Sequence, residues 1–335
     1  AFSIRKNDTI RFSIILKAKD TANTEIVGIK DLPNKISNNE KLYWLSLIWS
    51  ETKYNFVNID RLKFDLDSLY MSFIPLVLET KNDFEYYKAL QRFMASLHDG
   101  HSEVFSSFST YTDYIPLVFK DFNKKVYITS VTKIPESDST WLGAELIEIE
   151  GIPTVQYLES QIFPYISAST EQSLWMLGVL KLHSNLKDIP FRGKIRKTDG
   201  AIVNLNILRN GEEIRTPNDK YWGPEISYPK DIVELTWLQN DIALVSINKF
   251  YPEDEAIRKI DKVVKELYKA KGLIIDLRNN GGGSTAVAKH LQKYLSKQDY
   301  ILNYGAEIRI NDAYKKAQGN WKEKDKDYFL NKAYR

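Results

Sequence analysis

The sequence predicts a multidomain protein of mixed α/β and α+β class, with a helical N-terminal part, a central β region and a β-α-β core. Three observations support this prediction. Apolar residues recur at helical spacing over residues 38–108, whereas runs that alternate with a period of two dominate residues 112–218. Two apolar strands separated by one long helix follow over residues 242–277. At 335 residues, the chain is long enough for two or three domains with hydrophobic cores.

Residues 1–36 are expected to be the remnant of a small β domain. They hold two strand-like runs, at 8–16 and 25–29, and they end in a turn signal at 31–33. The abrupt start at Ala1 is expected to be an interior or trimmed one, since no signal peptide opens the chain.

The helical part is predicted to span residues 37–110. Three helices are expected there, at 40–56, at 67–78 and from 83 onward. The third helix should end at Gly100, because glycine suits the C′ position that follows a helix.

The β region is predicted at 111–220 and the β-α-β core at 221–335. In the β region we expect strands at 126–131 and 202–208, turns at 198–200 and 209–211, and one interrupting helix at 171–182. In the core we expect a strand at 242–247, a helix at 253–270, a strand at 273–277, a glycine loop and a helix at 285–296. A β-α-β unit of this kind requires two parallel strands.

The glycine loop is the most informative segment of the chain. Three consecutive glycines, 281–283, separate the second core strand from the last helix, where the backbone must turn or let a ligand approach bare N–H groups. Such N–H groups stabilise a phosphate, a carboxylate or an oxyanion. Ser284 directly follows and is interpreted as the helix N-cap rather than as a nucleophile.

Residues 276–283 read DLRNNGGG and resemble the signature of the S41 serine peptidases, the carboxyl-terminal-processing and tricorn-core proteases. The resemblance implies that the amides of Gly282 and Gly283 belong to an oxyanion hole. It also implies a crotonase-like or ClpP-like peptidase core. Counted with the segments below, it covers most of the chain from about residue 38 onward.

Two upstream segments extend the resemblance. Residues 97–102, LHDGHS, are similar to the Asp-Gly-His-Ser/Thr box of the tricorn-like branch, which implies that His101 is the general base. Residues 143–151 resemble the turn of a PDZ-like module, although positions 144, 145 and 150 depart from that pattern. The implied activity is hydrolysis of peptide bonds, near substrate C-termini, by acyl transfer.

The nucleophile is the missing part of this implied mechanism. In the family, the nucleophilic serine lies on a strand–helix junction downstream of the glycine loop, whereas residues 309–335 are polar and rich in lysine. The chain is therefore expected to carry the base and the oxyanion donors without the serine. It is either a fragment of a longer protein or a relative whose activity the resemblance overstates.

The amino-acid composition limits the kinds of partner and site that the chain is expected to have. The chain has no cysteine, which excludes disulfides, thiolate metal sites and cysteine catalysis. The net charge of +3 comes from interspersed acids and bases, so no nucleic-acid partner is expected. No apolar run approaches the ~20 residues of a membrane span. The expected partner is a peptide or protein substrate, and the resemblance implies an exported protein; the sequence leaves the oligomeric state open.

Alternative interpretations remain for the same residues. His101 alone fits a structural role at a helix end, and pairing with His98 on a metal lacks a third ligand, so no metal or cofactor is expected. Asp276 and Arg278 are interpreted as supports of the loop. The other two histidines, 183 and 290, are expected to lie on helices without acidic or serine neighbours.

Two rival functions also stay open at this stage. Residues 281–286 fit the degenerate Gly-x-Gly-x-x-Ala pattern of dinucleotide-binding proteins, but no second strand ends in an acidic residue at the ribose-binding spacing. The other rival is a peptide-binding scaffold without catalysis, built on the PDZ-like region.

Overall fold

The computed structural model describes residues 14–15, 32–105, 108–133, 137–187, 189–209, 221–223, 229, 231–296, 309–311 and 315. They divide into two compact units. The first holds the described residues up to 223 together with 309–311 and 315, and the second holds 229 and 231–296. The strand predicted at 25–29, most of that at 8–16 and most of the turn at 209–211 lie outside the described residues.

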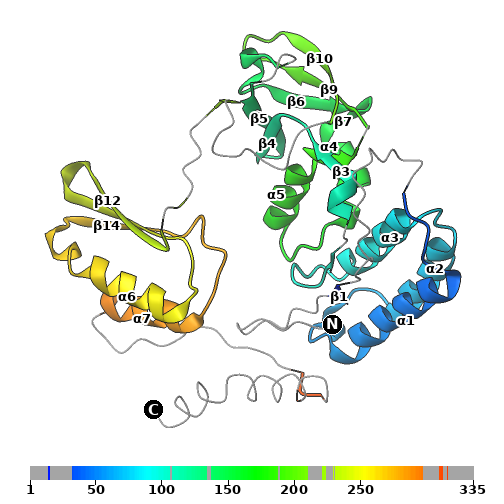
Figure 1. Cartoon of the computed structure of the whole chain (residues 1–335), viewed down its shortest axis with the longest axis horizontal. Helices are drawn as coiled ribbons and strands as arrows, with labels where there is room; N and C mark the ends of the chain where they lie inside the picture. The colour runs from blue at the N-terminus through cyan, green and yellow to red at the C-terminus, as the bar shows by residue number, and fades with distance from the viewer. Residues whose placement is uncertain are drawn as a thin grey trace. The chain divides into compact units, whose positions relative to one another are not determined.

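Three helices form the N-terminal part of the first unit (Figure 1). They are α1 (Asn38–Asn55), α2 (Leu66–Leu78) and α3 (Asp83–Ala95). Each begins at a side-chain cap: Ser37 forms a reciprocal capping box with Glu40, and Asp65 and Asn82 each accept a backbone N–H of the first turn. Their apolar faces share one core, in which Phe73 and Phe93 meet edge to face at 5.3 Å.

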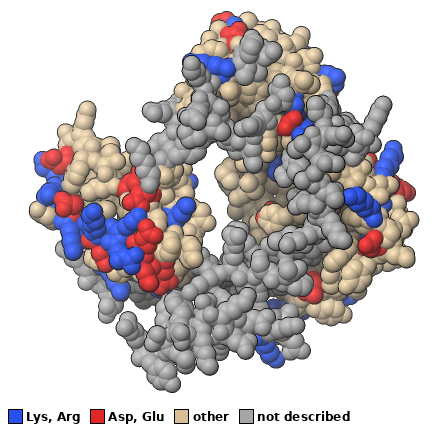
Figure 2. Space-filling model, viewed as in Figure 1, with Lys and Arg blue, Asp and Glu red and all other residues tan. Residues whose placement is uncertain are grey.

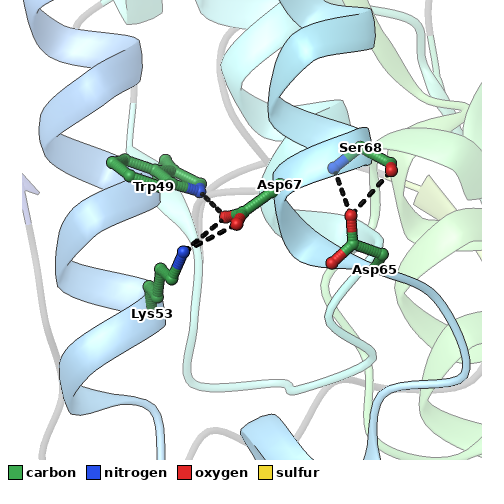
Figure 3. Close-up of polar contacts among 5 residues, drawn as sticks. All are labelled: Trp49, Lys53, Asp65, Asp67 and Ser68. Carbon is green, nitrogen blue, oxygen red and sulfur yellow. Dashed lines mark hydrogen bonds and ion pairs between the residues drawn. The ribbon is translucent and has the colours of Figure 1, made fainter.

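A polar contact ties α1 to α2 beside this core (Figure 3). The carboxylate of Asp67 accepts hydrogen bonds from the Trp49 indole at 2.8 Å and from the Lys53 ammonium at 2.7 Å. The neighbouring Asp65 accepts the backbone N–H of Ser68 at 2.7 Å and so caps α2. The two acids at the start of α2 therefore have different tasks, one closing the helix and one binding the adjacent helix.

The third helix ends earlier than predicted. It stops at Ala95, and the left-handed residue after it is His98, with φ 50°, rather than Gly100. Gly100 instead donates its N–H to the Ser169 hydroxyl at 2.9 Å. A contact with a segment far along the chain thus replaces the local C′ role that glycine suggested.

An antiparallel sheet forms the centre of the first unit, in the order β10-β9-β6-β5-β11, with β4 paired to β5 and β7 to β6. Its strands are β4 (Leu117–Phe122), β5 (Lys125–Thr132), β6 (Glu145–Ile149), β7 (Ile152–Pro153), β9 (Phe191–Arg196), β10 (Ile202–Ile207) and β11 (Tyr221–Trp222). Helices α4 (Thr154–Tyr157) and α5 (Glu171–Lys181) belong to the same region. Two further pairs accompany the sheet: β1 (Ile14–Ile15) with β2 (Val104–Phe105), and β3 (Thr112–Tyr114) with β8 (Ser184–Leu186).

Tight turns set the register of this sheet. The predicted turn at 198–200 is confirmed: Gly200 has φ 87°, and Lys197 donates its N–H to Ala201 at 2.8 Å. Asn123 and Lys124, at φ 49° and 61°, join β4 to β5. Positive φ at both central residues is the type I′ geometry that favours Asn-Gly. Lysine at the second position is therefore strained.

The second unit contains the predicted β-α-β core. Strand β13 (Ile242–Ile247) pairs in parallel with β14 (Gly272–Asp276), and α6 (Glu253–Val264) connects them. Helix α7 (Thr285–Leu295) follows the glycine loop and packs against α6. The mixed α/β and α+β class is thus confirmed. The helix predicted to reach 270 ends at Val264, before a short 3₁₀ turn, Leu267–Lys269.

One strand of this unit was not predicted. Strand β12 (Val233–Leu238) pairs antiparallel with β13, which makes the sheet order β12-β13-β14. Its exposed second half includes Trp237 and Leu238, so its alternation of apolar and polar residues is weak.

Acidic and basic side chains are interspersed on the face shown in Figure 2, notably over the unit that contains α6 and α7. Lys259 illustrates the pattern, since it pairs with Asp231 and, at 2.8 Å, with Glu255. Among the helices that the structure describes, none combines the length and the apolar character that a bilayer crossing requires.

Replacing Lys124 with glycine should stabilise the first unit by up to about 1 kcal/mol, because glycine adopts the left-handed conformation without strain. The salt bridge lost with it, to Glu171 at 2.6 Å, is exposed and contributes little. The control is Lys125→Gly at the adjacent strand position, which should lower stability by about 0.5–1 kcal/mol. Urea denaturation followed by tryptophan fluorescence compares the two, and equal effects would contradict the turn assignment.

Candidate functional site

The glycine loop lies between the carboxyl end of β14 and the first turn of α7, within the second unit. Gly282 and Gly283 have φ values of 99° and 142°, which side chains rarely adopt. Gly281 has no positive φ, and a Cβ added to it or to Gly282 would meet nothing within 4 Å. The loop is therefore open on one side and conformationally restricted to glycine at two of its three positions.

The backbone of Phe250 closes the other side of the loop. Its N–H donates to the Gly282 carbonyl at 2.9 Å, and its carbonyl accepts the Ser284 N–H at 2.8 Å, which forms an isolated parallel bridge. A Cβ added to Gly283 would lie 2.3 Å from the Phe250 carbonyl carbon and oxygen. Glycine is thus required at 283 by conformation and by space.

Asn280 fixes the loop from within, a role that its place in the DLRNNGGG segment did not indicate. Its side-chain oxygen accepts the Gly282 N–H at 2.7 Å, and its side-chain nitrogen donates to the carbonyl of Ile247, the last residue of β13, at 2.9 Å. Among the described residues, no hydrogen bond is donated by the N–H of Gly283. That amide remains available to an external acceptor, whereas the Gly282 amide already has an internal one.

Ser284 caps α7, as predicted. Its hydroxyl oxygen accepts the N–H of Ala286 at 3.2 Å. The same hydroxyl donates to the carboxylate of Glu253, the first residue of α6, at 2.5 Å. The cap therefore also links the starts of the two helices, a contact that the sequence did not indicate.

Asp276 and Arg278 support the strand end that leads into the loop. The guanidinium donates two bonds to the carboxylate, at 2.9 and 2.7 Å, and the Arg278 backbone N–H adds a third at 3.0 Å. The side-chain bonds to Arg278, followed by its backbone bond, lower the pKa of Asp276 to about 2. The Asp276 carboxylate thus accepts a loop amide, and the Arg278 side chain supports the loop by binding this carboxylate.

His101 lies in the segment that connects α3 to β2 in the first unit and is half-buried. The segment is fixed on both sides of the histidine. The Ser102 hydroxyl donates to Asp99 at 2.5 Å, and the Ser167 hydroxyl donates to the Ser102 carbonyl at 2.8 Å. In the described part of the chain, the imidazole itself makes no hydrogen bond or ion pair. Because His101 and the glycine loop belong to different units, their meeting stays a prediction.

The other histidines differ from expectation. His290 does lie on α7, but its Nε2 is 2.5 Å from Oδ1 of Asp261, which also accepts the Tyr294 hydroxyl at 2.7 Å. His183 lies just beyond the end of α5 and stacks on Tyr114 at 5.2 Å. The predictions for His183 and His290 did not include these contacts, because each contact joins residues from separate helices or strands. Within the described ranges, no three acidic or histidine side chains are grouped to hold a metal ion.

Comparisons with known proteins give a match to one family model and similarity to solved structures. Residues 241–330 match the model of peptidase family S41. Curated protein sequences give no match. Among solved structures, mature CPAF complexed with lactacystin is similar with a TM-score of 0.57 and 16% identity, over 76% of this chain and 59% of that one. Mature CPAF gives 0.55 and 17%, over 74% and 56%. This similarity shows the fold, and the chain spans less than two thirds of either neighbour.

Gly283→Ala should destabilise the second unit by about 3 kcal/mol or more, because the methyl group would overlap the Phe250 backbone and force an unfavourable φ. The matched control is Gly281→Ala, whose Cβ enters open space and should change stability by less than about 0.5 kcal/mol. Hydrogen exchange of the β13 and β14 amides measures both effects. Equal protection in the two variants would contradict the close approach.

Arg278→Met should raise the pKa of Asp276 from about 2 toward 3.8, with the remaining backbone hydrogen bond keeping it somewhat lower. Because the folded pKa is depressed, the ionised carboxylate stabilises the fold above pH 3.8 and loses this contribution as pH falls through about 2. Carboxyl ¹³C NMR titration gives the value. Lys271→Met, which removes the exposed partner of Asp241, is the control and should leave Asp276 unchanged.

Proposed function

We propose that this chain, whose residues 241–330 match the model of peptidase family S41, is a serine-type peptidase that hydrolyses peptide bonds by acyl transfer. The observation that carries this proposal is the Gly283 N–H. It is held at a strand–helix junction by the Phe250 and Asn280 contacts, and it has no acceptor among the described residues. A preorganised amide of this kind stabilises the negative charge that develops on a substrate carbonyl oxygen.

Gly283 supplies the first oxyanion donor in this proposal, and Gly282 supplies the second. The Gly282 N–H would be shared between the oxyanion and the Asn280 side chain, which bonds it at 2.7 Å. Neutral amides fixed before the substrate arrives need no reorganisation during the reaction. The loop is thus suited to a transient oxyanion.

His101 serves as the general base and later as the acid for the leaving amine. Its position supports the role in two respects: the flanking residues Asp99 and Ser102 are fixed by hydrogen bonds, and the imidazole is partly accessible. The nucleophilic serine lies outside the 335 residues in this proposal, since no serine follows Ser296. In this proposal, the β region at 111–220 acts as a PDZ-like module that presents the substrate, so that cleavage occurs near the substrate's C-terminus. The protein is proposed to be exported.

His101→Ala should lower kcat/KM for a fluorogenic peptide by about 10²–10⁴, the usual contribution of a general base. The matched control is His98→Asn, which keeps a residue that tolerates the left-handed conformation and should retain activity. The assay requires a protein that contains the nucleophilic serine. Labelling with a serine-directed phosphonate first shows that this serine is present and reactive.

Undiminished turnover of His101→Ala would show that another base acts. Saturable peptide binding without turnover or phosphonate labelling would favour the non-catalytic scaffold. Micromolar binding of a nicotinamide dinucleotide, lost on changes to the loop, would instead favour the nucleotide-binding alternative.

A further inference from the structure

The segment that carries His101 has little support from the helix that precedes it. Helix α3 ends at Ala95, and β2 begins only at Val104. Leu97 and Val104 are buried in the helical core, whereas residues 98–103 are exposed or half-buried. In the part of the chain that the structure describes, the imidazole makes no hydrogen bond or ion pair. The position of the ring therefore depends on how the backbone around it is held.

A tight turn places His101 at its third position. The Ser102 N–H donates to the Asp99 carbonyl at 3.1 Å, and the Ser102 hydroxyl donates to the Asp99 carboxylate at 2.5 Å. Both bonds lie inside the turn, so they determine its shape. The position of the turn within the unit must come from contacts with other segments.

Two serines from the segment before α5 supply such contacts, one on each side of His101. Gly100 donates its N–H to the Ser169 hydroxyl at 2.9 Å, and Ser167 donates its hydroxyl to the Ser102 carbonyl at 2.8 Å. A Cβ added to Gly100 would lie 3.5 Å from the Ser169 hydroxyl and 3.7 Å from its backbone nitrogen, so the two segments pack side by side. The turn is thus bound both before and after the histidine.

The segment that carries the two serines is itself held at both ends. Before it, the Tyr165 ring lies against α3, with the Lys88 ammonium 3.6 Å from the ring centroid. After it, Thr170 caps α5 by accepting the Ser173 N–H at 3.1 Å. Ala168, between the serines, is buried. A short connection that is fixed in this way is a firm support for its neighbour.

We propose that Ser167 and Ser169 are positioning residues that hold the His101 imidazole in the orientation that proton transfer requires. A general base must lie within hydrogen-bond reach of the proton that it takes, and a displacement of about 1 Å can lower the rate by about 10²-fold. Two bonds that flank the histidine prevent the turn from pivoting about either bond alone. This role of the two serines rests on the proposed function of His101 as the base.

NMR tests the structural part of the proposal on the 335-residue chain, with histidine labelled at Cε1. The chain has four histidines, so the spectrum is simple, and His101→Ala identifies the relevant signal. Replacing Ser167 and Ser169 together with alanine should shift and broaden the His101 signal, and each single variant should shift it less. The signals of His183 and His290, which lie in other parts of the fold, should not move.

Two controls separate positioning from general stability. Ser160→Ala removes a hydroxyl that donates to the Gln156 carbonyl one helical turn earlier, at 2.7 Å, and it should leave the His101 signal unchanged. Replacing Ser167 and Ser169 with threonine keeps a hydroxyl at each position and should restore the parental signal. The double alanine variant should unfold within a few degrees of the parent, which shows that it remains folded.

The kinetic test uses a protein that contains the nucleophilic serine. The double alanine variant should lower kcat for a fluorogenic peptide by about tenfold to hundredfold and change KM by less than about threefold, because the base acts in the chemical step. The double threonine variant should recover kcat. An unchanged His101 signal or kcat in the double alanine variant, or an equal loss in Ser160→Ala, would overturn the proposal. Full turnover by His101→Ala would instead refute the proposed function, while the NMR comparison still decides whether the serines hold the ring.

Discussion

The main chain of Phe250 approaches that of Gly283 so closely that no side chain fits between them, and the geometry of the glycine loop depends on this contact. It joins the segment after β13 to the segment after β14 beyond the last paired residues of the sheet. Ser284 is then positioned both to cap α7 and to reach Glu253 at the start of α6. A single backbone bridge thus aligns two strand ends with two helix starts.

Local sequence rules predicted most elements of this core, although they placed the end of α6 at 270 rather than at Val264 and missed β12. The strand at 242–247 has the predicted bounds, and β14 and α7 differ from prediction by one residue at their ends. These segments combine apolar strands, a clear cap and glycines, so neighbouring residues carry the signal. Phe250 gave no such signal, because its partners Gly282 and Ser284 are distant along the chain. Asn280 binds the nearby Gly282, but its second partner, Ile247, is also distant, and sequence patterns do not report such pairs.

The histidines also show that contacts between distant residues cannot be predicted from local sequence patterns. His98 took the left-handed position that Gly100 was expected to occupy, because Gly100 is bound to Ser169, which lies far along the sequence. His290 found an acidic partner on a neighbouring helix, which residue spacing within α7 could not reveal. The role of His101 came from a motif resemblance, and none of the described residues of its own unit is a hydrogen-bond or ion-pair partner of its imidazole.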